Sequence, residues 1–255
     1  MPYREASAAD LESFHNDGFL VVREAVLPKD LERLQTICDD LLERREQVAF
    51  DWAWEAGTER EKRAFKIVQT SPSLFNMKEL EQERFRVWAT AFASALLGRP
   101  VEFWYDQFLA KPPREGARTP WHQDEAYWGR NLDERGITCW MPFHDVDVEN
   151  GCMHFVRRGH LDGILAHRSA ENVQSDLLVC DVDPARVVPA PIRLGDVTFH
   201  HGKMPHMTTP NASPRWRRVL SQHFRAVGSK GEGDHYPWKI YVNQLTGQVH
   251  KPKVR

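Results

Sequence analysis

An imidazole and a carboxylate stand two residues apart in the stretch Trp-His-Gln-Asp-Glu-Ala-Tyr-Trp, residues 121–128. If this stretch is a β-strand, His122 and Asp124 point to the same face, because side chains alternate with a period of two. One imidazole and one carboxylate on the same face can bind one metal ion. A second imidazole from elsewhere would complete the 2-His-1-carboxylate set that holds Fe(II) in non-haem oxygenases.

The His-x-Asp pattern is weak evidence by itself, because three such triplets occur in the chain, beginning at His15, His122 and His160. The first falls at the end of an expected helix, where residues two apart diverge by about 200° and make a poor ligand pair. The residues leave the second imidazole open, and most histidines are expected to be packed or hydrogen-bonded in the core. The candidates are His144, His154, His200, His201, His206 and His223.

The segment of residues 195–218 resembles the C-terminal signature of the phytanoyl-CoA dioxygenase family. That signature is Gly-Asp, an apolar strand, a metal-binding His, an Asn five residues later and an Arg eleven residues after the His. In this chain these positions are His206, Asn211 and Arg217. Upstream, Lys-Pro-Pro-Arg-Glu-Gly at residues 111–116 resembles the family's approach to its first two ligands, and the resemblance covers roughly residues 10–227.

The resemblance implies Fe(II) bound by His122, Asp124 and His206, with 2-oxoglutarate as cosubstrate and O2 as oxidant. Arg217 would receive the far carboxylate of 2-oxoglutarate through two parallel N–H groups. Thr208 would add a hydroxyl to that carboxylate. The family also implies cosubstrate contacts at three further positions: Gln123, Trp140 and Lys66. The chain departs from the family at residues 156–160, where Val-Arg-Arg-Gly-His replaces a usual Pro-Gly-Ser-His turn.

The implied activity is hydroxylation of an unactivated C–H bond in a small molecule, with release of succinate and CO2. Related halogenases have a small residue where the carboxylate ligand would be, so the presence of Asp124 favours oxygenation. Two alternatives remain: desaturation, ring closure or epimerisation on the same metal site, or a non-catalytic jelly-roll binding module. Aromatic and imidazole side chains that could contact a bulky, apolar substrate are Trp104, Tyr105, Trp121, Tyr127, Trp128, His154 and His201.

The secondary structure expected to position these residues changes from mainly helices to mainly strands near residue 100. Amphipathic helices are expected over residues 7–18, 27–42 and 79–97, with a short strand at 19–22. Strands are then expected at 101–110, 121–127, 137–146, 152–156, 186–194, 197–201 and 216–227. We therefore predict an α+β, mainly β chain whose core is a jelly roll, which the resemblance specifies as a cupin-like double-stranded β-helix with N-terminal helices packed on it.

We predict a single domain over residues 1–255. It comprises a helical layer at 1–100, the jelly-roll core at 101–227 and a C-terminal extension at 228–255, of which 228–238 is a candidate lid. The net charge of −2 gives no reason to expect nucleic acid or an acidic membrane surface as partner. We expect a cytoplasmic monomer or homodimer with four buried, reduced thiols: Cys38, Cys139, Cys152 and Cys180.

Overall fold

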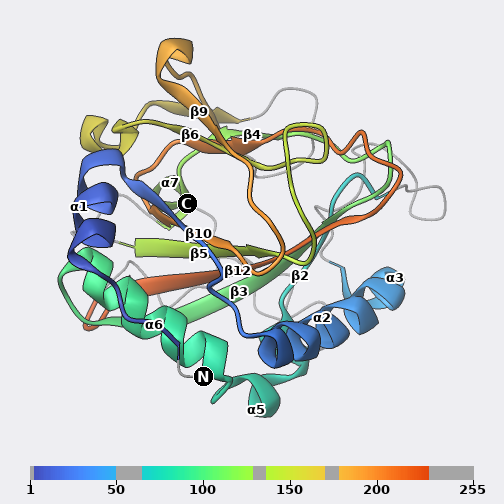
Figure 1. The fold of residues 1–255 in the computed structure, drawn as a ribbon. Coiled ribbons are helices and arrows are strands. Elements are labelled where there is room, and N and C mark those ends of the chain that lie inside the picture. Colours follow the sequence, from blue (N-terminus) through green and yellow to red (C-terminus); the bar gives the residue numbers. More distant parts are fainter. Residues whose placement is uncertain (1–2, 50–64, 129–135, 170–177, 230–255) are drawn as a thin grey trace, which may run out of the picture.

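The computed structural model describes residues 3–49, 65–128, 136–169 and 178–229. In this part of the chain, two antiparallel sheets lie on opposite sides of a pocket, and helices cover the outer face of the larger sheet (Figure 1). The fold is mainly β, with helices concentrated in the N-terminal part of the sequence. The predicted fold class, a β-sandwich of jelly-roll type with N-terminal helices, is confirmed.

The larger sheet carries a row of four side chains on its inner face, and three of them, Thr138, His200 and His223, line the pocket. Thr138 pairs with His200 on one side and His223 on the other, and His223 pairs with Tyr105. Directly paired residues lie on the same face of a sheet, so these four side chains form one row across four strands. The strand order is β1 (Phe19–Val22), β10 (Val197–His201), β5 (Gly136–Pro142), β12 (Arg217–Ala226), β3 (Val101–Lys111) and β2 (Val68–Thr70).

The smaller sheet brings together two histidines that are distant in sequence. His206 at the start of β11 pairs directly with His122 at the end of β4, and their ring centroids are 4.2 Å apart. The strand order is β4 (Thr119–His122), β11 (His206–Thr208), β6 (Met153–Val156) and β9 (Val187–Ala190). A separate two-stranded sheet pairs β7 (His167–Ser169) with β8 (Leu178–Cys180).

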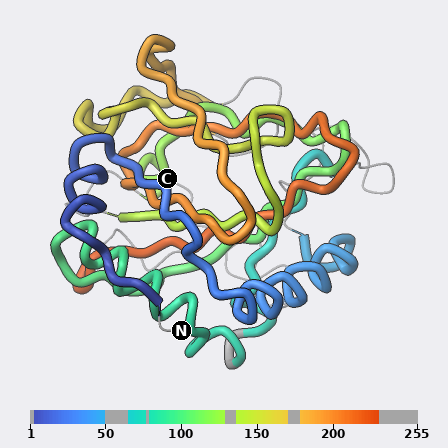
Figure 2. The backbone as a smooth tube through the Cα atoms, viewed as in Figure 1, coloured from blue at the N-terminus to red at the C-terminus, as the bar shows by residue number. Residues whose placement is uncertain are grey.

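Helices from the N-terminal part of the chain pack against the face of the larger sheet that is turned away from the pocket. Ser7 and Asp10 form a capping box at the start of α1 (Ala8–Asp17), as expected from this sequence. Helix α6 (Arg84–Leu97) contacts α1 and β3, and its Phe92 stacks on Phe199 of β10 with ring centroids 5.1 Å apart. Figure 2 shows the N-terminal helices and α6 following one another around this side. The other helical elements are α2 (Pro28–Glu43), α3 (Arg45–Val48), α4 (Pro72–Phe75), α5 (Met77–Leu80), α7 (Asp124–Trp128), η3 (Gly159–Asp162) and η4 (Pro184–Arg186).

Two of the expected elements are wrong in detail. The helix expected over 79–97 is interrupted, because the Glu83 side chain accepts a hydrogen bond from the Arg86 amide and so caps a new helix at Arg84. The strand expected over 121–127 ends at His122, and α7 begins two residues later at Asp124. Residues 230–238 of the candidate lid, and the rest of the C-terminal extension after them, lie outside the described residues.

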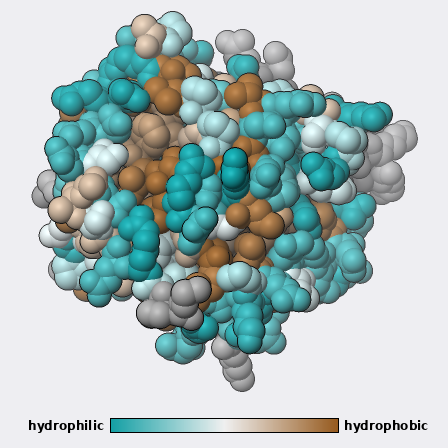
Figure 3. Space-filling view, viewed as in Figure 1, coloured by the Kyte–Doolittle hydropathy of each residue, from teal (hydrophilic) through white to brown (hydrophobic). Residues whose placement is uncertain are grey.

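The visible face in Figure 3 is largely hydrophilic, with hydrophobic side chains in small separate groups. Among the described residues, no helix combines the length and the apolar composition that a membrane crossing requires. All four cysteines are buried and carry free thiols.

Candidate metal and cosubstrate site

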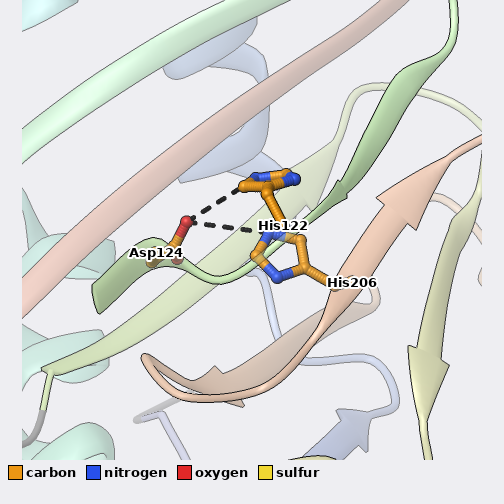
Figure 4. Close-up of side chains that lie close together, drawn as sticks. All are labelled: His122, Asp124 and His206. Carbon is orange, nitrogen blue, oxygen red and sulfur yellow. Dashed lines mark ion pairs between the residues drawn. The ribbon is translucent and has the colours of Figure 1, made fainter. Parts of the chain in front are cut away.

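His122, Asp124 and His206 converge on one point between the two sheets (Figure 4). One ligand atom from each lies within 4.8 Å of the others. The Asp124 Oδ1 atom is 3.9 Å from His122 Nε2 and 3.7 Å from His206 Nε2. The expected reason for this geometry was wrong: His122 and Asp124 do not share a strand. They converge because the chain turns from β4 into α7 between them.

Backbone carbonyls fix the orientation of both imidazoles. His122 Nδ1 is 2.8 Å from the Pro120 carbonyl oxygen, and His206 Nδ1 is 2.9 Å from the Met204 carbonyl oxygen. A carbonyl oxygen can only accept, so each Nδ1 carries the proton. The unprotonated Nε2 of each ring therefore faces Asp124, as a metal ligand requires.

The two oxygens of the Asp124 carboxylate have different partners. Thr138 Oγ1 donates to Oδ2 at 2.5 Å, and His200 Nε2 lies 3.2 Å from the same oxygen. Oδ1, which faces the two ligand histidines, is left for a cation. Burial raises the pKa of Asp124, but His206 and the hydrogen bond to His200 outweigh burial and lower it well below its usual range. The side chain is therefore a carboxylate at neutral pH, and the donor set fits a divalent ion of the Fe(II) class.

Trp128 anchors the short helix that carries Asp124. A Cβ atom at Gly136 would lie 1.8 Å from Trp128 Cζ3, and one at Gly202 would lie 2.7 Å from the same atom. Two glycines are therefore needed where β5 and the loop after β10 pass the indole ring. Trp128 Nε1 also donates to Tyr105 Oη at 2.8 Å. These contacts support the ligand helix, and neither Trp128 nor Tyr105 lines the pocket.

Arg217 lines the same pocket as the three metal-ligand candidates, together with Thr208 and Trp140. Arg217 is 2% exposed, and its Cζ atom lies 5.8 Å from the centroid of the Trp140 ring. Its Nε and Nη1 atoms have no hydrogen-bond partner among the described residues. Burial lowers the pKa of Arg217 to about 9, which leaves it charged at neutral pH. A buried cation with unused donors is suited to an anionic ligand.

The structure does not bring Gln123 or Lys66 to this pocket. The Gln123 amide donates to the Gly163 and Lys203 carbonyls at 2.7 and 2.6 Å, because the turn between β4 and α7 points it away from the ligands. Lys66 is paired with Glu115 at 3.7 Å near the surface, and its neighbour Ile67 lines the pocket instead. We do not carry a cosubstrate role forward for either residue.

The remaining substrate candidates lie outside the pocket lining. Tyr127 is the nearest: its ring centroid is 5.9 Å from that of His122, and its hydroxyl accepts from the Leu178 amide. His201 Nδ1 accepts from the Lys203 amide at 3.0 Å. The others also have local roles or positions away from the pocket: His154 near the Cys152 carbonyl, Trp104 against Trp128, and Trp121 on β4.

The residues that sequence reasoning missed follow the period of two along the larger sheet. Ser221 and His223 of β12 lie on the same face as Arg217, and Gln107 of β3 pairs with Ser221. His223 Nε2 lies 3.1 Å from Gln107 Oε1. His200 and His223 were candidates for the third ligand, but the structure places both beside Asp124 Oδ2 and not beside Oδ1. Counting alternate residues from Arg217 and Trp140 could have found Ser221 and Thr138, and it could have placed His223 on the same face as Arg217.

The sequence model of the family described as "Phytanoyl-CoA dioxygenase (PhyH)" matches residues 14–219. The chain belongs to this family. It is 28% identical over 123 residues to "Phytanoyl-CoA dioxygenase domain-containing protein 1" of Danio rerio, an alignment that covers 46% of this chain and 42% of that protein. The chain thus spans about half the length of the curated relatives it matches.

Solved structures extend the similarity to nearly the whole chain. EvdO2 from Micromonospora carbonacea var. aurantiaca, solved with 2-oxoglutarate, superposes with a TM-score of 0.73 and 27% identity over 92% of this chain and 96% of that chain. The α-ketoglutarate-dependent carbocyclase SnoK superposes with a TM-score of 0.67 over 89% of this chain and 86% of that chain. At 24% identity, SnoK shows a shared fold alone.

The buried histidines of this PhyH-family site predict acid sensitivity of the metal-free protein. Burial is the main cause that lowers the pKa of His122 to about 3, of His206 to about 4 and of His223 to about 3. In the unfolded chain the same groups titrate near pH 6.5, so at lower pH the unfolded state binds protons that the folded state excludes. The free energy of unfolding is expected to fall by roughly 1.4 kcal/mol per pH unit for each histidine as the pH drops from about 6.5 towards 4.

Urea unfolding followed by tryptophan fluorescence at a series of pH values measures this slope. Above about pH 7.5 the three histidines are neutral in both states and contribute no slope. His223→Asn should reduce the slope below pH 6.5 by about one proton, whatever its effect on absolute stability. An identical slope in wild type and variant would contradict the assignment.

Proposed function

We propose that this protein is an Fe(II)/2-oxoglutarate-dependent dioxygenase that hydroxylates an unactivated C–H bond of a small molecule. One observation carries the proposal: a pocket that holds the His-Asp-His donor set also contains a buried guanidinium with unused donors. Membership of the PhyH family and the likeness to EvdO2, which was solved with 2-oxoglutarate, support it.

In this proposal each chain residue has a defined task. His122, Asp124 and His206 would hold Fe(II), and the bound ion would supply the binding of the 2-oxo acid group and of O2. When bound, iron with its cosubstrate supplies the oxidation that converts 2-oxoglutarate, O2 and R–H to succinate, CO2 and R–OH. Thr138 and His200 hold the second oxygen of Asp124. Arg217 orients the far carboxylate of the cosubstrate.

Anaerobic titration tests the metal and cosubstrate parts of this proposal together. Fe(II) followed by 2-oxoglutarate should produce the metal-to-ligand absorption band of a chelated 2-oxo acid. Exposure to O2 should then give slow release of succinate even without substrate, and a metabolite screen for faster release would find the substrate. No band and no succinate from folded protein would show that this chain is a binding module and not an oxygenase.

Hydroxylation is preferred to halogenation because Asp124 would occupy the ligand position that a halide needs. Ring closure, desaturation and epimerisation are the alternatives on the same metal site. All of these reactions would use the same residues, so product identification separates them. Mass spectrometry distinguishes an alcohol, with one more oxygen atom, from a ring-closed or desaturated product, with two fewer hydrogen atoms, and from an epimer of unchanged mass; NMR distinguishes ring closure from desaturation. A cytoplasmic location and a monomeric or homodimeric state remain predictions.

A further inference from the structure

Lys111 is a fully buried lysine next to the guanidinium of Arg217. It is the last residue of β3, pairs in register with Arg217 of β12, and has an exposed fraction of 0%. Both residues lie on the pocket face of the sheet, because they continue the alternation through Gln107 and Ser221. Two buried cations side by side are unusual, since a buried charge is normally paired with an opposite one.

The contacts of Lys111 are all with uncharged oxygens. Its Nζ atom is 2.7 Å from Thr208 Oγ1, 2.7 Å from the Thr209 carbonyl oxygen and 3.4 Å from the Thr208 carbonyl oxygen. No carboxylate of the described residues forms a salt bridge with Lys111 or Arg217. Burial, followed by the charge of Arg217, lowers the pKa of Lys111 well below its usual range. An anion bound beside the two side chains would stabilise both charges.

The hydrogen bond to Thr208 has a direction that matters for such an anion. An ammonium group has donors and no acceptor, so Thr208 Oγ1 must accept from a charged Lys111. The hydroxyl proton of Thr208 is then free to be donated elsewhere. Thr208 lines the pocket together with Arg217. A carboxylate beside Arg217 would be an acceptor for that proton.

We infer that Lys111 is a positioning residue for the far carboxylate of the 2-oxo diacid: it directs the Thr208 hydroxyl towards that carboxylate and places a second positive charge behind it. This inference rests on the function proposed above and concerns a residue that does not itself line the pocket. It replaces Lys66, whose ammonium is paired with Glu115 near the surface.

The test compares two ligands that differ only in the far carboxylate. Calorimetry under anaerobic conditions measures the Kd of 2-oxoglutarate and of 2-oxopentanoate, which has the same carbon chain without the far carboxylate, for the Fe(II)-loaded protein. Lys111→Met should raise the Kd of 2-oxoglutarate roughly ten- to a hundredfold, because a charge-assisted contribution is lost. The Kd of 2-oxopentanoate should change less than about twofold, within the accuracy of such a comparison. Lys29→Met is the control and should change neither value, because Lys29 is an exposed lysine in the first turn of α2 and does not line the pocket.

Thr208 variants test the same route without touching the lysine. Thr208→Val should weaken 2-oxoglutarate binding about tenfold, whereas Thr208→Ser, which keeps the hydroxyl, should bind like wild type. The effects of Lys111→Met and Thr208→Val should combine to less than their product, because both remove one shared interaction. Thr208→Val and Thr208→Ser keep the inference testable if Lys111→Met does not fold.

The outcomes separate this inference from the proposed function. If wild type prefers 2-oxoglutarate to 2-oxopentanoate and Lys111→Met keeps the full preference, the inference on Lys111 is wrong and the proposed function stands. Fully independent effects of Lys111→Met and Thr208→Val would also overturn it. If wild type binds the two ligands equally well, the assignment of 2-oxoglutarate itself fails.

Discussion

Replacing Asp124 with alanine is expected to abolish Fe(II) binding and succinate release. The change removes one of three protein ligands and also the acceptor for Thr138 and His200. Loss of a residue that only supports a ligand typically weakens metal affinity about 10- to 100-fold, so loss of the ligand itself should exceed 100-fold. Anaerobic titration of the metal-free protein with Fe(II), read by calorimetry, gives the affinity directly.

Asp162→Ala is the matched control, because it alters the aspartate of another His-x-Asp triplet. Asp162 forms a surface salt bridge with Arg186 at 2.7 Å and has a side chain that is 39% exposed. Its loss should leave metal affinity unchanged, since an exposed pair contributes little even to stability. Wild-type Fe(II) affinity in Asp124→Ala would refute the proposed metal centre.

Replacing Arg217 with methionine is expected to separate cosubstrate binding from stability. Two charge-assisted hydrogen bonds to the far carboxylate would be lost, which predicts a rise in the KM for 2-oxoglutarate of roughly 100-fold or more. The protein without cosubstrate should be as stable as wild type or more stable, because a buried guanidinium with two unused nitrogens is removed. Fe(II) affinity should not change, since Arg217 contacts none of the three ligands.

Arg218→Met is the control for this experiment. Arg218 is the next residue of β12, on the opposite face, and its guanidinium pairs with Asp39 of α2. Its loss should lower the melting temperature slightly and leave the KM for 2-oxoglutarate unchanged. A KM that rises equally in both variants would indicate general disruption of β12 and contradict a specific role for Arg217.

The two arginines also show what period-two reasoning can predict. Side chains alternate along a strand, so Arg218 must point away from the face that carries Arg217, and the structure has Arg217 in the pocket and Arg218 paired with Asp39. The same reasoning failed between His122 and Asp124, because nothing in the sequence marked the change from strand to helix at Gln123. Residue spacing identified the ligands, but it did not give the backbone geometry that brings them together.

The sequence alone could not predict contacts between strands that are far apart in the chain. The sequence showed Lys111 as the start of a Lys-Pro-Pro run after a strand. Its contact with Thr208, 97 residues later in the chain, depends on how the two sheets meet. The choice among His200, His206 and His223 likewise depends on the register of β10, β11 and β12. At Lys66 and Ile67, an offset of one residue decided which side chain lines the pocket.

The position of Arg217 on β12 has a consequence for ligand length. β12 is hydrogen-bonded to β3 on one side and to β5 on the other, so it cannot slide relative to the strand that carries Thr138, the partner of Asp124. These ladders fix the backbone of Arg217 relative to that of Thr138, and burial restricts the guanidinium further. If Arg217 binds the far carboxylate as proposed, the site would select for ligand length: a diacid one carbon shorter would not reach the guanidinium, and one carbon longer would have to bend to fit.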